Sequence, residues 1–154
     1  MRIISRFTPI LLVFVLSACS EEALTPEEEI RQFIEQAVES AEKRSADELD
    51  ELMHRDYLDQ SGYNKKALGK LLRLYFFRHK NIYLFTRIDD IHVFSENEAE
   101  VDMHLAMAGS VIADVNALAS LRARMYRFEL RLLKDEEWLL QHAKWSPASI
   151  ADMQ

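Results

Sequence analysis

Residues 124–146 decide the fold of the end of the chain, and they read RMYRFELRLLKDEEWLLQHAKWS. The first half alternates apolar and charged positions, the apolar ones being Tyr126, Phe128, Leu130 and Leu132. This period of two predicts a strand with one buried face. The charged run at 134–137 predicts a turn into a last strand, from Trp138 to Trp145, that stops at Pro147.

The same period extends upstream. Val101, Met103, Leu105 and Met107 alternate with polar neighbours, which predicts another half-buried strand. Residues 82–94 are rich in isoleucine, valine and aromatic residues, and their alternation slips at 87–90, which predicts a bend or bulge. Residues 110–121 fit either a loop or a short helix.

The first half of the chain is helical in pattern. Thr25-Pro26-Glu27-Glu28 is a capping box with proline at the first helical position, and apolar residues then recur at helical spacing as far as Ala41. Ser45-Ala46-Asp47-Glu48 opens a second helix that we expect to contain Leu49, Leu52 and Met53. A loop is predicted from His54 to Gly62, and a third helix from Asn64 to about Lys80. Helices followed by strands predict one α+β domain.

The first twenty residues have the pattern of an export signal. Arg2 and Arg6 precede an apolar stretch at 10–16, which is too short to cross a bilayer as a helix. Leu16-Ser17-Ala18-Cys19 resembles the bacterial lipobox, which implies cleavage before Cys19 and a diacylglycerol group on its thiol.

That resemblance divides the chain into a signal peptide at 1–18, a lipidated start and tether at 19–24, and a domain at 25–154. It implies a protein anchored in the bacterial cell envelope and facing the periplasm. Ser20, rather than aspartate, favours the outer membrane by analogy.

Composition excludes several classes of function. A net charge of −7 argues against nucleic-acid binding, which needs a basic face. Three glycines cannot build a glycine-rich phosphate loop, and the single cysteine excludes an intrachain disulfide framework. The histidines lack ligand spacing, so we expect neither a metal site nor a cofactor.

The order of elements resembles the nuclear-transport-factor-2-like superfamily, also called SnoaL-like. The resemblance covers about residues 26–147 and includes the loop Arg55-Asp56-Tyr57-Leu58 and the closing strand Glu137–Ser146. It implies a cone of three N-terminal helices on a curved antiparallel sheet of about four strands. It implies no single reaction, because the superfamily contains isomerases, dehydratases, binding modules and assembly domains.

Enzymes of this superfamily hold an acid–base carboxylate inside the cone, often beside a tyrosine or histidine. Asp56, Tyr57 and Asp59 are the candidates here, with Tyr126 on the sheet. The alternative is that Tyr57 and Leu58 fill the core while Asp56 and Asp59 are solvated loop acids. A binding module would instead line its cone with apolar residues, for which the candidates are Met103, Met107, Tyr126 and Phe128.

His104 shares one strand face with Asp102 and Glu100, opposite the apolar face of the same strand. We expect this face to point outward, toward solvent or a second subunit, with Arg127 and Arg131 as cross-strand partners. An acid–base or metal cluster is the alternative. The basic stretches Lys65-Lys66 and Arg78-His79-Lys80 predict a solvated face or, alternatively, contact with lipid headgroups.

Three functions follow. The first is a non-catalytic envelope lipoprotein whose cone binds a small apolar ligand or an envelope protein. The second is a small periplasmic enzyme that uses Asp56 or Asp59. The third is a structural module that forms a homodimer through the outer sheet face. A buried acid in the cone favours the enzyme, an open apolar cone favours the binding protein, and a filled cone favours the structural module.

Overall fold

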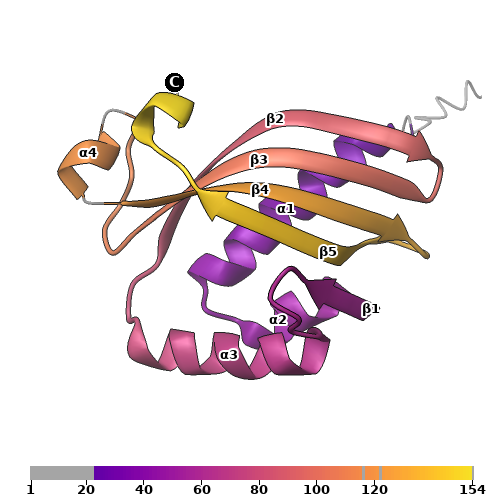
Figure 1. The fold of residues 1–154 in the computed structure, drawn as a ribbon, viewed down its shortest axis with the longest axis horizontal. Helices are drawn as coiled ribbons and strands as arrows, with labels where there is room; N and C mark the ends of the chain where they lie inside the picture. The colour runs from indigo at the N-terminus through magenta and orange to yellow at the C-terminus, as the bar shows by residue number, and fades with distance from the viewer. Residues whose placement is uncertain (1–22, 116, 122, 154) are drawn as a thin grey trace, which may run out of the picture.

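The computed structural model describes residues 23–115, 117–121 and 123–153 (Figure 1). Its elements in chain order are α1 (Pro26–Glu42), α2 (Ala46–Glu51), β1 (Met53–Asp59), α3 (Lys65–Arg78), β2 (Tyr83–Ser95), β3 (Glu98–Ala108), α4 (Ala117–Leu121), β4 (Arg124–Lys134), β5 (Trp138–Pro147) and the 3₁₀ helix η1 (Ile150–Met153). The expected signal peptide, Cys19 and most of the tether lie outside the described residues.

Local capping signals fix the starts of the three main helices. Thr25 Oγ1 accepts from the Glu28 amide while the Glu28 carboxylate accepts from the Thr25 amide, so the predicted capping box is confirmed. The Ser45 and Asn64 side chains likewise accept amide hydrogen bonds at the starts of α2 and α3.

The five strands form one sheet in the order β1-β5-β4-β3-β2. The four strands predicted from the sequence, β2 to β5, pair antiparallel as expected, and β1 adds a fifth strand that runs parallel to β5. The sheet is therefore mixed rather than purely antiparallel. The fifth strand is the segment predicted as a loop after α2. Leu58 pairs with His142, 84 residues later, and a pairing over that distance leaves no local signal in the sequence.

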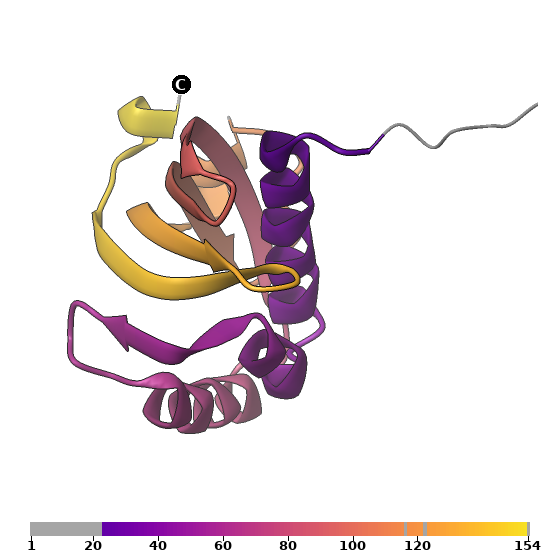
Figure 2. The ribbon, with the colours of Figure 1, turned by 90° about the vertical axis from the view of Figure 1, so that its right-hand side faces the viewer.

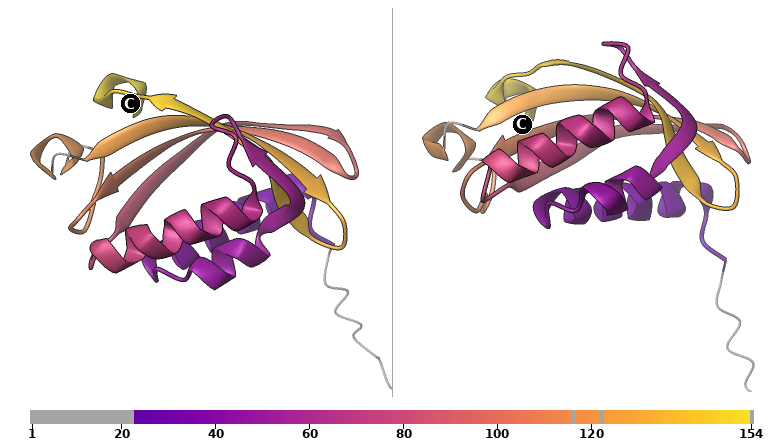
Figure 3. Two further views of the ribbon diagram at one scale, coloured as in Figure 1. Left: turned by 60° about the horizontal axis from the view of Figure 1, so that its bottom comes forward. Right: turned by 90° about the horizontal axis from the view of Figure 1, so that it is seen from below.

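The sheet curves around α1, while α2 and α3 lie below it, across the open side (Figures 2 and 3). The predicted irregularity in β2 is confirmed as a register shift between Ile88 and Asp90. The main core lies on the concave side and joins α1 to β3, β4 and β5 through residues such as Ile30, Val101, Leu132 and Trp138. On the opposite face, α4 packs over the sheet through Leu118 and Ala106, so the ambiguous segment contains a short helix.

Candidate functional site

A cavity of about 370 Å³ lies between α1, α3 and the concave face of the sheet. Among the described residues that line it, only Tyr57, Asp59 and Trp145 have a nitrogen or oxygen atom in the side chain. The other lining side chains are aliphatic, aromatic or methionine, and they come from the three N-terminal helices and all five strands. They are Phe33, Ile34, Ala37, Val38, Ala41, Leu49, Leu52, Met53, Leu68, Leu72, Leu84, Met103, Leu105, Phe128, Leu130, Leu140 and Ala143. Such a cavity favours an apolar molecule and offers very few groups to orient it.

Asp59 is the one carboxylate that the described residues place in this cavity. It ends β1 and is only 3% exposed, so the expectation of a solvated loop acid is wrong. Its Oδ1 accepts from the amides of Ser61 and Tyr63, at 2.8 and 2.9 Å, in a turn that Gly62 closes at φ +82°. Its Oδ2 is buried without a hydrogen-bond partner among the described residues. Asp59 thus keeps one free acceptor in an apolar setting.

Tyr57 lies two residues before Asp59, on the same face of β1, and is also 3% exposed. Burial, and then the charge of Asp59, raises the pKa of the Tyr57 hydroxyl. The hydroxyl therefore stays protonated at neutral pH and can donate a hydrogen bond. No hydrogen-bond partner for it lies in the described part of the chain.

The period of two along β1 corrects the other expectations for this segment. Asp56 points outward with its side chain 73% exposed, close to Arg55, and so lies outside the cavity. Leu58 is half exposed rather than part of the core. Successive strand residues face opposite sides, so the buried pair is Tyr57 and Asp59 rather than Tyr57 and Leu58.

The four residues expected to line a pocket fall into two groups. Met103 and Phe128 line the cavity, and Phe128 stacks at a tilt on Trp145 with 6.1 Å between ring centroids. Tyr126 is not among the lining residues. Met107 packs in a separate small cluster with Phe76, where its sulfur accepts from the Tyr75 hydroxyl.

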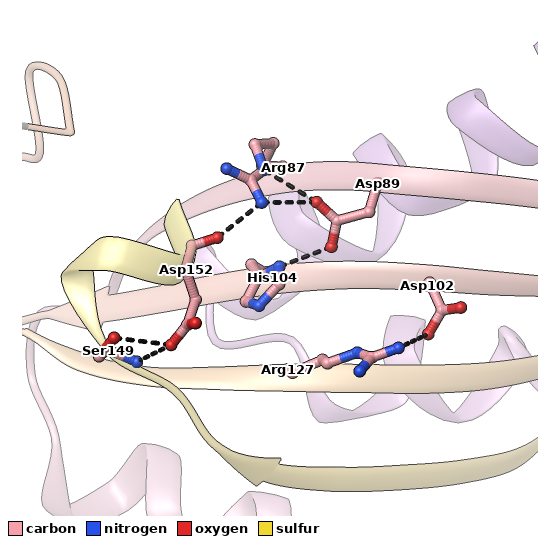
Figure 4. Close-up of polar contacts among 7 residues, drawn as sticks. All are labelled: Arg87, Asp89, Asp102, His104, Arg127, Ser149 and Asp152. Atoms are coloured by element: carbon pink, nitrogen blue, oxygen red, sulfur yellow. Dashed lines mark hydrogen bonds and ion pairs between the residues drawn. The ribbon is translucent and has the colours of Figure 1, made fainter. Parts of the chain in front are cut away.

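The outer face of the sheet is polar, as expected, but His104 is not solvated. As expected, Arg127 and Arg131 are cross-strand partners of this face: Arg131 pairs with Glu100 directly opposite at 2.7 Å, and Arg127 pairs diagonally with Asp102 at 3.1 Å. His104 itself is only 8% exposed, and its Nδ1 lies 2.6 Å from Asp89 on the neighbouring strand (Figure 4). Sequence reasoning missed this partner because the bulge in β2 decides which way Asp89 points.

Among the described residues, Phe77 on helix α3 is the most exposed large apolar side chain, at 87%, and Leu71 and Leu74 on the same helix are half exposed. The helix has five basic residues and no acidic one, and two of these form ion pairs with α2, Lys65 with Asp50 and Arg73 with Asp47. It lies on the opposite side of the molecule from the start of α1 (Figures 1 and 2).

Among the described residues, no group of three or more His, Cys, Asp or Glu is placed to hold a metal ion. No helix of the described part is both long and apolar enough to cross a bilayer.

By sequence, no family model and no curated protein matches the chain. By structure, it is similar to a putative scytalone dehydratase from Novosphingobium aromaticivorans, with TM-score 0.63 and 13% identity over 80% of this chain and 84% of that one. It is similar to a nuclear-transport-factor-2-like protein of unknown function from Shewanella oneidensis, with TM-score 0.58 and 15% identity over 79% and 99%. A cystatin-like domain of unknown function from Nostoc punctiforme gives TM-score 0.61 and 14% identity over 82% and 80%. At these identities the likeness shows the fold alone.

Proposed function

We propose that this protein is a lipoprotein of the cell envelope whose cone binds a small apolar molecule with one hydrogen-bond donor. The proposal starts from the nuclear-transport-factor-2-like α+β fold of the chain. The observation that carries the proposal is the free Oδ2 of Asp59 in an otherwise apolar cavity. A buried acceptor without a partner costs free energy, which a donor on the ligand recovers. Apolar walls supply affinity, and the single carboxylate supplies orientation.

The size of the cavity supports a ligand of one or two fused rings or a short chain. Its volume of about 370 Å³ is at the small end of the range for ligand pockets. Phe128 and Trp145 offer aromatic faces, and Tyr57 offers a protonated hydroxyl near the carboxylate.

A matched pair of probes tests the proposal. Fluorescence titration with 2-naphthol and naphthalene compares one ring system with and without a hydroxyl donor. We expect 2-naphthol to bind about tenfold or more tightly, since a hydrogen bond to a charged group contributes about 1.5–3 kcal/mol. In Asp59→Asn, which keeps an oxygen for the Ser61 and Tyr63 amides, the preference should disappear.

Asp56→Asn is the control, because that carboxylate is exposed and lies outside the cavity. It should retain the wild-type preference for 2-naphthol. Equal binding of the two probes by the wild-type protein would contradict the proposed role of Asp59, and binding of neither would contradict a ligand site in the cone.

The second candidate is an acid–base enzyme, favoured by the same buried carboxylate beside a protonated phenol. Asp59 would accept a proton from carbon next to a carbonyl, and Tyr57 would donate a hydrogen bond to the carbonyl oxygen. One structural neighbour is named a putative scytalone dehydratase and another a ketosteroid isomerase-like protein, which agrees with this chemistry.

Proton exchange separates this candidate from simple binding. In D₂O, 2-tetralone should exchange its α-protons faster with the protein than in buffer, as measured by NMR, and Asp59→Asn should abolish the acceleration while Asp56→Asn retains it. Exchange at the buffer rate, together with normal binding of 2-naphthol, would leave the binding function and exclude this chemistry for the ketone.

The lipid anchor is the remaining part of the proposal and rests on Leu16-Ser17-Ala18-Cys19. A short tether would bring the start of α1 close to the bilayer, and α3 would then face away from it. We therefore favour a solvated face for the basic stretches of α3 over contact with lipid headgroups.

Radiolabelled palmitate should enter the wild-type protein and not Cys19→Ser, which should also remain uncleaved or become soluble. Label in Cys19→Ser would contradict the anchor. The homodimer alternative stays a prediction, which sedimentation of the purified protein tests.

A further inference from the structure

Asp59 is a buried carboxylate without a counterion. It is 3% exposed and lines the cone, and the described residues place no lysine, arginine or histidine side chain in that lining. Lys65, on the helix that follows, is committed elsewhere, because its ammonium donates to the Met53 backbone oxygen and lies 3.5 Å from Asp50. A buried negative charge costs free energy unless a cation pairs with it. A ligand that brings a positive charge would supply the missing cation.

The backbone around Asp59 stabilises this negative charge. Oδ1 accepts hydrogen bonds from the amides of Ser61 and Tyr63, at 2.8 and 2.9 Å, and such bonds favour the charged form of a carboxyl group. The charge also contributes, after burial, to the raised pKa of the Tyr57 hydroxyl. Oδ2, which has no partner among the described residues, is the oxygen left for a ligand.

The strands beside Asp59 bring aromatic rings to the same part of the cone. Asp59 pairs with Ala143 across β1 and β5, and both residues line the cone. Trp145 lies two residues beyond Ala143 on the same face of β5 and also lines the cone. Phe128 pairs with Trp145 across β4 and β5, and the centroids of the two rings are 6.1 Å apart. The face of an aromatic ring attracts a cation.

The side chain of Gln60 ties Trp145 to the segment that carries Asp59. Its Nε2 donates to the backbone oxygen of Trp145 at 2.8 Å, and its Oε1 accepts from the Trp145 amide at 3.2 Å. The backbone amide of Gln60 donates to the Ala143 oxygen at 3.1 Å. Three hydrogen bonds from one residue therefore hold the backbone of Trp145 beside the turn that begins at Asp59.

We infer that the ligand of the cone is an apolar amine, bound in its protonated form. Its ammonium group would donate to Oδ2 of Asp59, and the rings of Trp145 and Phe128 would attract the same charge. The aliphatic walls would hold its apolar body. An alkylamine is protonated at neutral pH, as the lysine side chain is. This inference rests on the proposed binding function, since it concerns the same cone and names the class of ligand.

A neutral donor and an anion fit these groups less well. A hydroxyl group satisfies Oδ2 but leaves the charge of Asp59 unbalanced, and an anion would meet that charge as repulsion. The net charge of −7 also raises the concentration of cations around the protein and lowers that of anions.

Two probes of matched shape test the inference. Isothermal titration calorimetry on the full chain in mild nonionic detergent compares 2-naphthylmethylamine hydrochloride with 2-naphthalenemethanol. The ring system and the linker are the same, and the amine alone is charged. We expect the amine to bind at least about tenfold more tightly, as charge-assisted hydrogen bonds are the stronger ones. Sodium chloride at about 0.5 M should change this preference less than threefold, because a buried ion pair is screened little.

Variants of the carboxylate separate the site from general charge attraction. Asp59→Asn keeps an oxygen for the Ser61 and Tyr63 amides and should abolish the preference for the amine. Asp56→Asn is the matched control and should retain it, since Asp56 is an exposed acid outside the cone.

Variants of the aromatic wall test the second part of the site. Trp145→Leu should weaken binding of the amine about threefold to tenfold and of the alcohol by less, because the attraction of the ring for a cation is lost. Gln60→Ala should lower the preference in the same direction by releasing Trp145. Gln141→Ala is its control, since Gln141 is also on β5 or beside it in the sheet but lies outside the cone, and it should leave the preference unchanged.

Equal affinity of the wild-type protein for the amine and the alcohol would overturn the inference, as would a preference that Asp59→Asn retains. If Asp59→Asn fails to fold, the wild-type comparison and Trp145→Leu still decide the question. Preference for 2-naphthol over naphthalene without preference for the amine would leave the proposed function and reject the amine. Binding of none of these naphthalene compounds would reject both.

Discussion

The two faces of the sheet use the same strand in opposite ways. On β3, Met103 and Leu105 face the cavity, where Asp59 is the only carboxylate in the described part of the chain. The alternate residues Asp102 and His104 face outward into a network of paired charges. The concave face therefore depends on apolar burial, which pH and salt hardly change, whereas the outer face depends on charges that both can change.

The largest change in the free energy of unfolding is expected for substitutions on the concave face. Some positions on this face are tightly packed, and others line the cavity. Leu132→Ala should lower the free energy of unfolding by about 2–5 kcal/mol, because Leu132 is fully buried and truncation leaves a void. Phe128→Ala should cost clearly less than the roughly 3–5 kcal/mol of a fully buried phenylalanine, because Phe128 is half-buried and already borders a cavity.

Urea unfolding of both variants measures the difference. An equal loss in the two variants would mean that Phe128 is packed as tightly as Leu132, and that the cavity is closed in solution. The affinity of Phe128→Ala for 2-naphthol gives a second measurement. Because Phe128 forms part of the cavity wall, the substitution should change this affinity more than it changes the free energy of unfolding.

Much of the fold could be predicted from local signals. The capping box at Thr25, the N-cap at Ser45 and the alternation along β3 and β4 each depend on neighbours within a few residues. The strand β1 could not be predicted in this way. Its inward position 59 is an aspartate and its outward position 58 is a leucine, the reverse of the usual pattern, and its partner β5 is distant in the chain.

The candidate sites could be predicted only in part, because their geometry also depends on contacts between residues that are distant in the chain. Tyr57 and Asp59 were named, but their burial follows from β1 being a strand rather than a loop. The slip at residues 87–90 was visible in the sequence, but its consequence for Asp89 and His104 was not. That consequence depends on the bulge geometry and on the C-terminal segment, which carries no periodic signal.

Replacing Asp89 on the outer face should change the free energy of unfolding by an intermediate amount. Burial raises the pKa of its carboxyl, but hydrogen bonds and charges from Arg87 and His104 outweigh burial and hold the pKa below its usual value. A lowered carboxyl pKa contributes stability above the unfolded-state value of about 3.9, and that stability is lost as the pH falls through the folded-state pKa.

Asp89→Asn should therefore cost on the order of 1 kcal/mol at pH 7, and the difference from the wild-type protein should shrink below about pH 4. Urea unfolding across this range measures it. Arg87→Gln should reproduce part of the effect, because it removes one of the two partners that lower the pKa of Asp89. If the difference in the free energy of unfolding between Asp89→Asn and the wild-type protein stayed constant down to pH 3, the contribution of Asp89 would come from packing rather than from its charge.

The smallest change in the free energy of unfolding is expected for the ion pair of Glu129 and Lys144. The Lys144 Nζ and Glu129 Oε2 atoms lie 2.9 Å apart, and both side chains are about half exposed. Exposed ion pairs contribute about 0–1 kcal/mol, since water screens them and both side chains lose freedom in forming them. Glu129→Gln should change the free energy of unfolding by less than about 0.5 kcal/mol, and 1 M salt should remove the difference. A loss as large as that of Asp89→Asn, persisting in high salt, would show that the outer face is shielded from solvent. The contrast between the two faces would then fail, and a partner covering this face, such as a second copy of the chain, would become the better explanation.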